Sequence, residues 1–252
     1  GTGAAGTYTC SGVTTTTQTL PTAGTSPLTV TTNPGFSITT AGSAFELFGN
    51  GGLTFTDHNA STIITGYSGN GIYAVNNGTG ALSITSNGAV TGRESGIVAR
   101  NNGTGALSIT STGAVEGTTY YGIVAINNGT DLTIDTDAVT GGQSGITAWN
   151  EGTGALSITS TGAVKGTAYN GINAIIYNTA STGALSITST GAVTGGESGI
   201  VARNNGTGTI TITHSGAVTG TTGIKVDDRT NNSPATINSF APITGTGGFA
   251  ID

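Results

Sequence analysis

A hydrophobic segment of the form GIxAxN returns along this chain about every 25 residues. Its first two residues stand at Gly71-Ile72, Gly96-Ile97, Gly122-Ile123, Gly145-Ile146, Gly171-Ile172 and Gly199-Ile200, with a degenerate copy, GIKVDD, beginning at Gly223. The intervals are 25, 26, 23, 26, 28 and 24 residues. A repeat of this length is typical of solenoids, in which each copy is one supersecondary unit that stacks on the next.

Two further segments keep the same phase. An LSIT-like run begins at Leu82, Leu107, Leu132, Leu156, Leu185 and Ile210, and a GAVTG-like run places its valine at Val90, Val115, Val139, Val164, Val193 and Val218. Within each segment apolar and intervening residues alternate, and a period of two indicates a strand with one row of side chains pointing inward. Gly, Asn, Ser and Thr fill the connections, as expected of tight turns. Each period is therefore predicted to be three short strands.

Stacking identical coils places each strand beside its copy one period later, where parallel ladder hydrogen bonds form. The sequence thus predicts an all-β, three-faced parallel β-helix with about 25 residues per coil and about nine or ten coils. Residues 71–252 form its regular repeats, and residues 1–70 form an N-terminal cap with bulkier, irregular coils of the same solenoid. The predicted core consists of aligned Ile, Ala and Leu ladders. The asparagines that follow the GIxAx segment are predicted to form an internal or corner ladder of hydrogen bonds.

Composition narrows the classes of function. The chain of 252 residues has six Lys and Arg against twelve Asp and Glu, a formal net charge of −6. These charges are too few to line a nucleic-acid groove or to keep a long tail disordered. No run approaches the roughly 20 apolar residues of a membrane-spanning helix. Cys10 is the only cysteine, so no internal disulfide and no cysteine-based metal site is expected.

The start, GTYTCSGVTTTTQTL, and the GTGALSITSTGAVTG-type repeats resemble the passenger domains of monomeric autotransporters of Gram-negative bacteria. The resemblance covers nearly the whole chain. It implies a right-handed parallel β-helix that is displayed outside the cell after passage through a C-terminal outer-membrane β-barrel. That barrel is absent from this sequence, so the resemblance implies that the sequence is a passenger fragment. Passengers cross the outer membrane unfolded, and the single cysteine agrees with this.

Catalytic chemistry has little support in the sequence, and we expect no enzyme, cofactor or metal site. The only dense acidic set is Asp131, Asp135 and Asp137. We interpret it as a solvated or turn-forming group in one variant coil, with calcium binding as the alternative. His58 and His214 fall on different coils without a paired histidine or cysteine, so metal binding is not expected there. No nucleophile stands beside a base.

Outward residues of the LSIT strands form two columns of hydroxyl side chains. They read Ser83, Ser108, Thr133, Ser157, Ser186 and Thr211 in one column and Thr85, Thr110, Asp135, Thr159, Thr188 and Thr213 in the other. Such a face resembles the ice-binding faces of antifreeze β-solenoids. The alternative is that Thr is simply a soluble strand former whose hydroxyls pair along the stack. Asp135 and the serines interrupt the threonine pattern.

Outward residues of the GIxAxN strands are more apolar. Val98, Val124, Ile126, Trp149 and Ile175 are predicted to form a contiguous exposed strip bordered by Arg100 and Arg203. Trp, Tyr and Arg are enriched at binding hot spots, and exposed apolar patches mark interaction surfaces. The predicted partner-binding residues are Tyr73, Val98, Arg100, Tyr120, Tyr121, Val124, Ile126, Trp149, Tyr169, Ile175 and Arg203. The alternative is that these side chains only stabilise the strands.

These patterns favour a non-enzymatic passenger at the surface of a Gram-negative bacterium, acting as an adhesin or host-receptor-binding effector. The expected partner is a host-cell surface protein or glycan, or another copy of the chain, and not a nucleic acid. The cognate outer-membrane barrel is a further expected partner. A structural stalk or self-associating rod is the main alternative, and an ice-binding solenoid is the next.

Overall fold

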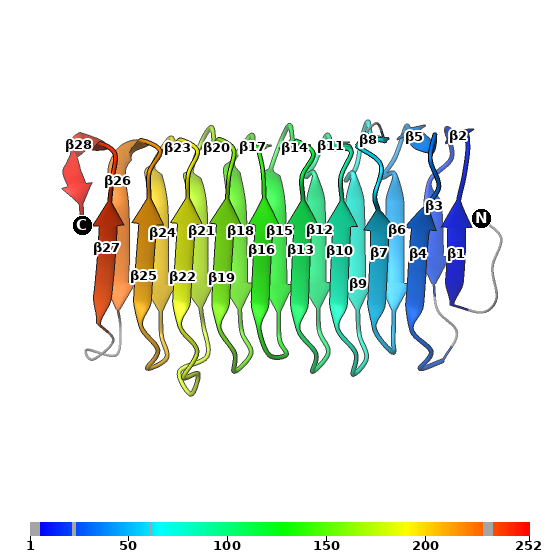
Figure 1. The fold of residues 1–252 in the computed structure, drawn as a ribbon, viewed down its shortest axis with the longest axis horizontal. Coiled ribbons are helices and arrows are strands. Elements are labelled where there is room, and N and C mark those ends of the chain that lie inside the picture. The colour runs from blue at the N-terminus through cyan, green and yellow to red at the C-terminus, as the bar shows by residue number, and fades with distance from the viewer. Residues whose placement is uncertain (1–5, 22–23, 61, 229–233) are drawn as a thin grey trace.

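The computed structural model describes residues 6–21, 24–60, 62–228 and 234–252, and within them every regular element is a β-strand. The strands form a parallel solenoid of about 25 residues per coil (Figure 1). Each coil contributes one strand to each of three parallel stacks, so the predicted three-faced β-helix is confirmed. No helix of the described residues is long and apolar enough to cross a membrane.

The first stack is a sheet of ten strands and carries the LSIT segments. Its strands are β1 (Thr7–Cys10), β4 (Leu28–Thr32), β7 (Leu53–Asp57), β10 (Leu82–Ser86), β13 (Leu107–Ser111), β16 (Leu132–Thr136), β19 (Leu156–Ser160), β22 (Leu185–Ser189), β25 (Ile210–His214) and β27 (Ala235–Ser239). We call its outer surface the hydroxyl face. At the ~4.8 Å spacing of adjacent strands, ten strands make a rod on the order of 45 Å long.

The second stack is narrow because its strands carry only the GAVTG segments, and we call its outer surface the short face. Its strands are β2 (Val13–Thr14), β5 (Ser37–Thr40), β8 (Ile63–Gly66), β11 (Ala89–Gly92), β14 (Val115–Gly117), β17 (Val139–Gly141), β20 (Val164–Gly166), β23 (Val193–Gly195) and the first residues of β26 (Val218–Asp228) and β28 (Ile243–Ile251).

The third stack carries the GIxAxN segments, and we call its outer surface the aromatic face. Its strands are β3 (Gln18–Pro21), β6 (Phe45–Gly49), β9 (Ile72–Asn76), β12 (Ile97–Asn101), β15 (Tyr121–Asn127), β18 (Ser144–Asn150), β21 (Asn170–Ile176), β24 (Ser198–Asn204) and the later residues of β26 and β28.

The solenoid is right-handed. In Figure 1 the chain runs up the ten-stranded sheet nearest the viewer, turns over at the top, descends at the back, and advances from the N-terminus on the right to the C-terminus on the left. Seen along the axis from the N-terminal end, this path turns clockwise as it recedes. It is the hand that parallel β crossovers favour.

The core consists of the predicted ladders. Ile72, Ile97, Ile123, Ile146, Ile172 and Ile200 stand in register and are fully buried, as are the alanines two residues after them. Glycine is required before each isoleucine because the chain approaches its neighbours closely there. A Cβ on Gly96 would lie 2.5 Å from Cγ1 of Val115 and 2.8 Å from the carbonyl oxygen of Gly122.

Coils before residue 70 bury larger side chains in the same ladders. Phe45 packs against Phe36 and Phe55 with ring centroids 5.8 and 5.0 Å apart. Strand pairing runs on across residue 70, since β6 pairs with β9 and β7 with β10. Residues 1–5, 22–23 and 61 of the expected N-terminal region lie outside the described residues.

The asparagine ladder forms the corner between the aromatic and hydroxyl faces, as predicted. The Nδ2 group of Asn76 donates to Oδ1 of Asn101 at 2.9 Å, Asn101 donates likewise to Asn127 at 2.9 Å, and Asn127 to Asn150 at 3.2 Å. These side chains are fully buried, so the stacked amides satisfy one another in place of water. Ile176 occupies the next position, and Asn204 follows it.

Candidate functional site

Tyrosine replaces a small or polar residue twice in the turn that leads into the aromatic face. Backbone hydrogen bonds align Glu94, Tyr120, Gln143, Tyr169 and Glu197 in one column, because the N–H group of each donates to the carbonyl oxygen of the residue before it in this order. Tyr120 and Tyr169 are 43% and 44% exposed. Two coils separate them, which corresponds to about 10 Å along the rod. Neither β-propensity nor core packing accounts for an exposed tyrosine in a turn.

On the strands of the aromatic face, the outward side chains alternate between covered aliphatic groups and larger groups that cover them. Ile126 and Ile175 are both only 8% exposed, while Arg100 is exposed and Trp149 and Arg203 are half-buried. These five residues are consecutive neighbours in one column of the ladder, in the order Arg100, Ile126, Trp149, Ile175, Arg203.

This alternation corrects the predicted exposed strip. Ile126 and Ile175 point outward, but Trp149 between them and the arginines beyond them shield their methyl groups from water. Val98 and Val124 are half-buried on the parallel column. The accessible surface therefore consists of the aromatic and arginine side chains, with Val98 and Val124 partly accessible beside them, and not of a continuous aliphatic strip.

Trp149, Tyr177 and Arg203 come together as an aromatic cluster. The rings of Trp149 and Tyr177 meet edge to face with centroids 5.8 Å apart, and the guanidinium carbon of Arg203 lies 6.0 Å from the centroid of the Tyr177 ring. Arg203 also donates through Nε to Oδ1 of Asn205 at 2.8 Å and lies 3.7 Å from a carboxylate oxygen of Asp227. Edge-to-face rings and a cation over a ring are each worth about 0.5–1.5 kcal/mol.

The long interval between Gly171 and Gly199 positions this cluster, because its added residues follow β21 and carry Tyr177 over Trp149. Tyr177 remains 38% exposed. The indole Nε1–H of Trp149 has no hydrogen-bond partner among the described residues. An unpaired buried donor of this kind costs about 1–3 kcal/mol.

The remaining predicted residues lie on the same side of the rod but outside this cluster. Tyr73 is half-buried against Phe48, with ring centroids 6.0 Å apart. Tyr121 is half-buried next to Tyr120, at a centroid distance of 6.5 Å. Phe48 was not among the residues predicted from the sequence. It lies on β6 directly beside Val75 of β9, in the irregular coils where no repeat marks the outward positions.

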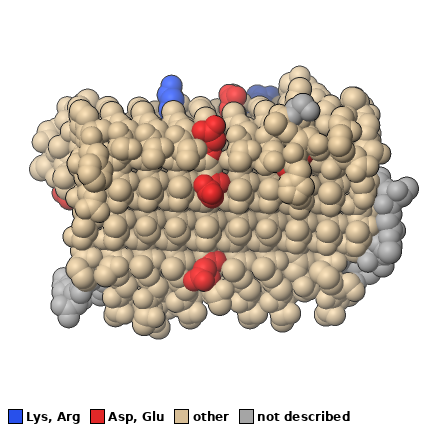
Figure 2. Space-filling view, viewed as in Figure 1, with Lys and Arg blue, Asp and Glu red and all other residues tan. Residues whose placement is uncertain are grey.

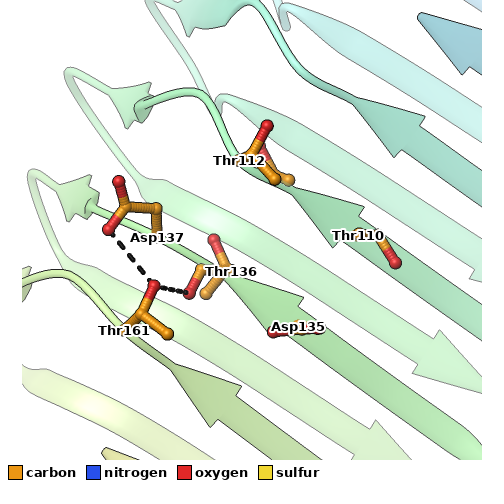
Figure 3. Close-up of a pocket in the computed structure, with 7 residues that line it drawn as sticks. Thr110, Thr112, Asp135, Thr136, Asp137 and Thr161 are labelled. Atoms are coloured by element: carbon orange, nitrogen blue, oxygen red, sulfur yellow. Dashed lines mark hydrogen bonds between the residues drawn. The ribbon is translucent and has the colours of Figure 1, made fainter. Parts of the chain in front are cut away.

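The acidic set does not converge. Asp131 precedes β16 and Asp137 follows it, so the length of the strand separates them. Asp135 points outward from the strand, two residues before Asp137 (Figure 3). Within the described residues, no group of three or more His, Cys, Asp or Glu side chains could hold a metal ion. The calcium alternative is therefore not supported by this arrangement.

Asp131 and Asp137 instead lie in two shortened turns of the coil between Gly122 and Gly145, which is only 23 residues long. Asp131 stands where four other coils have a Gly-Ala pair, and its Oδ1 accepts from the N–H of Ala155 at 2.8 Å. Oδ1 of Asp137 accepts from the hydroxyl of Thr161 at 3.4 Å (Figure 3). The shortened coil leaves a shallow depression of about 330 Å³ lined by Thr110, Ser111, Thr112, Asp135, Thr136, Asp137 and Thr161.

The two histidines and the cysteine, which could act as metal ligands or nucleophiles, lie far apart along the chain. His58 is exposed after β7, whereas His214 is fully buried in the first stack, with Nδ1 3.0 Å from the carbonyl oxygen of Gly216. Burial raises the pKa of the Cys10 thiol, so little of the nucleophilic thiolate is present at neutral pH. The aromatic cluster and the turn tyrosines, by contrast, bring recognition-type side chains together on one side of the rod.

No family model matches the chain, and neither a curated protein nor a solved structure matches it. The autotransporter resemblance therefore stays a prediction from the sequence.

Proposed function

We propose that the protein is a non-enzymatic adhesin, the passenger of an autotransporter displayed on a Gram-negative cell, and that it binds through its aromatic side. The contact surface comprises the turn tyrosines Tyr120 and Tyr169 and the cluster of Trp149, Tyr177 and Arg203. The partner is a host-cell surface protein or glycan, or a second copy of the rod.

The exposed turn tyrosines carry this proposal. Each occupies a turn position where Glu or Gln serves equally well in the neighbouring coils. A large ring held 43–44% exposed gains little from folding. Tyr and Trp bring large contact areas at a small cost in side-chain entropy, which is why they dominate binding hot spots.

The rigid scaffold supports the same proposal. Parallel ladders fix the rows of side chains along the axis, so Tyr120, Tyr169 and the Trp149 cluster keep their relative positions before a partner arrives. Preorganisation of this kind lowers the entropy lost on binding.

The test uses the purified protein in two assays: saturable binding to cultured animal epithelial cells, and self-association by sedimentation velocity. The informative variant is Tyr120→Ser with Tyr169→Ser, and the matched control is Phe240→Ser, an aromatic residue 75% exposed at a different corner. We expect the double variant to weaken the observed binding at least tenfold, and the control to leave it unchanged.

Absence of both cell binding and self-association would contradict the proposal and favour a structural stalk. Equal losses in the double variant and the Phe240→Ser control would contradict the assignment of the surface. Thermal melts of the unaltered chain, the double variant and the control verify that the solenoid is intact. We expect no change in melting, because Tyr120, Tyr169 and Phe240 are exposed.

A further inference from the structure

The hydroxyl face differs from every other surface of the rod in its uniformity. All outward positions of its ten strands are Ser or Thr except Asp135 and Asn238. The threonine column extends beyond the repeats, through Thr56, Thr31 and Thr9, in unbroken register. Figure 2 shows the face as flat, regular rows nearly free of charge.

Almost all hydroxyls of this face are not used by the described residues; the exception is Thr213, whose hydroxyl oxygen accepts from Nδ2 of Asn238 at 3.3 Å at the C-terminal end of the face. Among the described residues, the side chains of Thr85, Thr110, Thr159 and Thr188 make no hydrogen bond. The structure thus gives no support to the alternative in which the hydroxyls pair along the stack. The donors and acceptors of these four threonines are directed to solvent.

The threonines are also held rigidly. A β-branched side chain has few χ1 rotamers, and each one here packs between neighbours in the adjacent strands. Most are half-buried, which leaves a hydroxyl and a methyl group at the surface without a protruding chain. The result is a grid with ~4.8 Å between strands and ~6.6 Å between alternate residues of one strand.

These spacings are close to the oxygen spacings on faces of hexagonal ice. We propose that the hydroxyl face binds ice crystals, by ordering a layer of water that continues into the crystal lattice. Ice is an uncharged lattice, and outside Asp135 this face carries no ionic side chain, so it meets ice without stripping hydrated charges. The other faces carry such charges, for example Glu116 and Lys165 on the short face and Arg100 on the aromatic face. This activity is independent of the adhesion proposed above.

Asp135 interrupts the threonine column between Thr110 and Thr159. A carboxylate holds its own hydration shell, so it separates the face into two shorter arrays. The proposal therefore includes a gain of function: Asp135→Thr joins the arrays and strengthens ice binding.

The test is partition of the purified protein into slowly growing ice, with inhibition of ice recrystallisation as the second readout. The disrupting variant is Thr110→Tyr with Thr159→Tyr, two coils apart on the hydroxyl face. Its matched control is Thr140→Tyr with Thr194→Tyr, also two coils apart but exposed on the short face. Circular dichroism melts confirm that all variants stay folded.

We expect the unaltered chain and the control to be enriched in ice at least threefold over serum albumin. The enrichment of the disrupting variant should fall to the albumin level, and that of Asp135→Thr should exceed the enrichment of the unaltered chain. Lack of enrichment of the unaltered chain would overturn the proposal, as would equal enrichment of the two tyrosine variants. Adsorption to microcrystalline cellulose without enrichment in ice would also overturn it, and would make this face a glycan-binding surface.

Discussion

The hydroxyl face and the aromatic face are built from the same coils with the same strand spacing, yet their outward columns follow different rules. On the hydroxyl face, neighbouring coils carry the same small side chain, and each one remains partly accessible. On the aromatic face, large and aliphatic side chains alternate, so Ile126 and Ile175 are only 8% exposed although they point outward.

This difference teaches that pointing outward and being exposed are separate properties in a solenoid. The backbone decides which side chains point outward, since the strand period is two. The size of the residues one coil before and one coil after decides how much of each side chain reaches water. A uniform column gives an even surface, and an alternating column gives isolated exposed groups.

The largest effect is expected at the corner that both faces share. Asn127 accepts from Asn101 and donates to the carbonyl oxygens of Thr130 and Asp131 and to Asn150, at 2.9–3.2 Å. Asn127→Ala leaves these buried groups unpaired, and we expect a loss of about 3–4 kcal/mol in the free energy of unfolding, measured by urea denaturation. The adjacent Asn128 is exposed, and Asn128→Ala should cost less than about 0.5 kcal/mol. Similar losses for the two variants would refute the structural role of the ladder.

A smaller effect distinguishes the two faces directly. Ile126→Ala removes methyl groups that are covered by Arg100 and Trp149, so we expect a loss of about 2 kcal/mol although the residue points outward. Thr110→Ala, at an outward position of the hydroxyl face, should change stability by about 0.5 kcal/mol or less. Urea denaturation of both variants checks the difference, and equal losses would contradict the proposed shielding by neighbouring coils.

The smallest effect on stability is expected at the turn tyrosines. Tyr169→Ser removes a ring that is 44% exposed and has no ring partner among the described residues. We expect the free energy of unfolding to change by no more than about 0.5 kcal/mol. A loss comparable with that of Ile126→Ala would show that the ring serves the fold, and would remove the main support for a binding role.

The sequence predicted the fold because its repeat encodes it locally. Ile97, Ala99 and Asn101 recur in phase with Ile123, Ala125 and Asn127, and the strand register follows this phase from β9 to β26, shifting only where β26 pairs with β28. The buried ladders and the asparagine corner could therefore be derived without coordinates.

The candidate site was only partly predictable, because it depends on lateral contacts between unlike coils. The period identifies Ile126 as outward but gives no measure of the cover that Trp149 provides. The contact between Tyr177 and Trp149 arises from added residues after β21, whose path no repeat specifies. Likewise, the roles of Asp131 and Asp137 follow from two shortened turns, and composition alone suggests only an acidic cluster.

Hydroxyl-radical footprinting of the protein, free and bound to epithelial cells or to itself, tests the binding account most directly. Mass spectrometry of the recovered chain would quantify oxidation at Tyr120, Tyr169, Tyr177 and Trp149, with Phe240, 75% exposed at a different corner, as the internal reference. We predict at least a threefold protection of the four aromatic-side residues and no protection of Phe240. Saturable binding with unchanged oxidation of the tyrosines, or with protection of Phe240 instead, would contradict the assignment of the aromatic side as the contact surface.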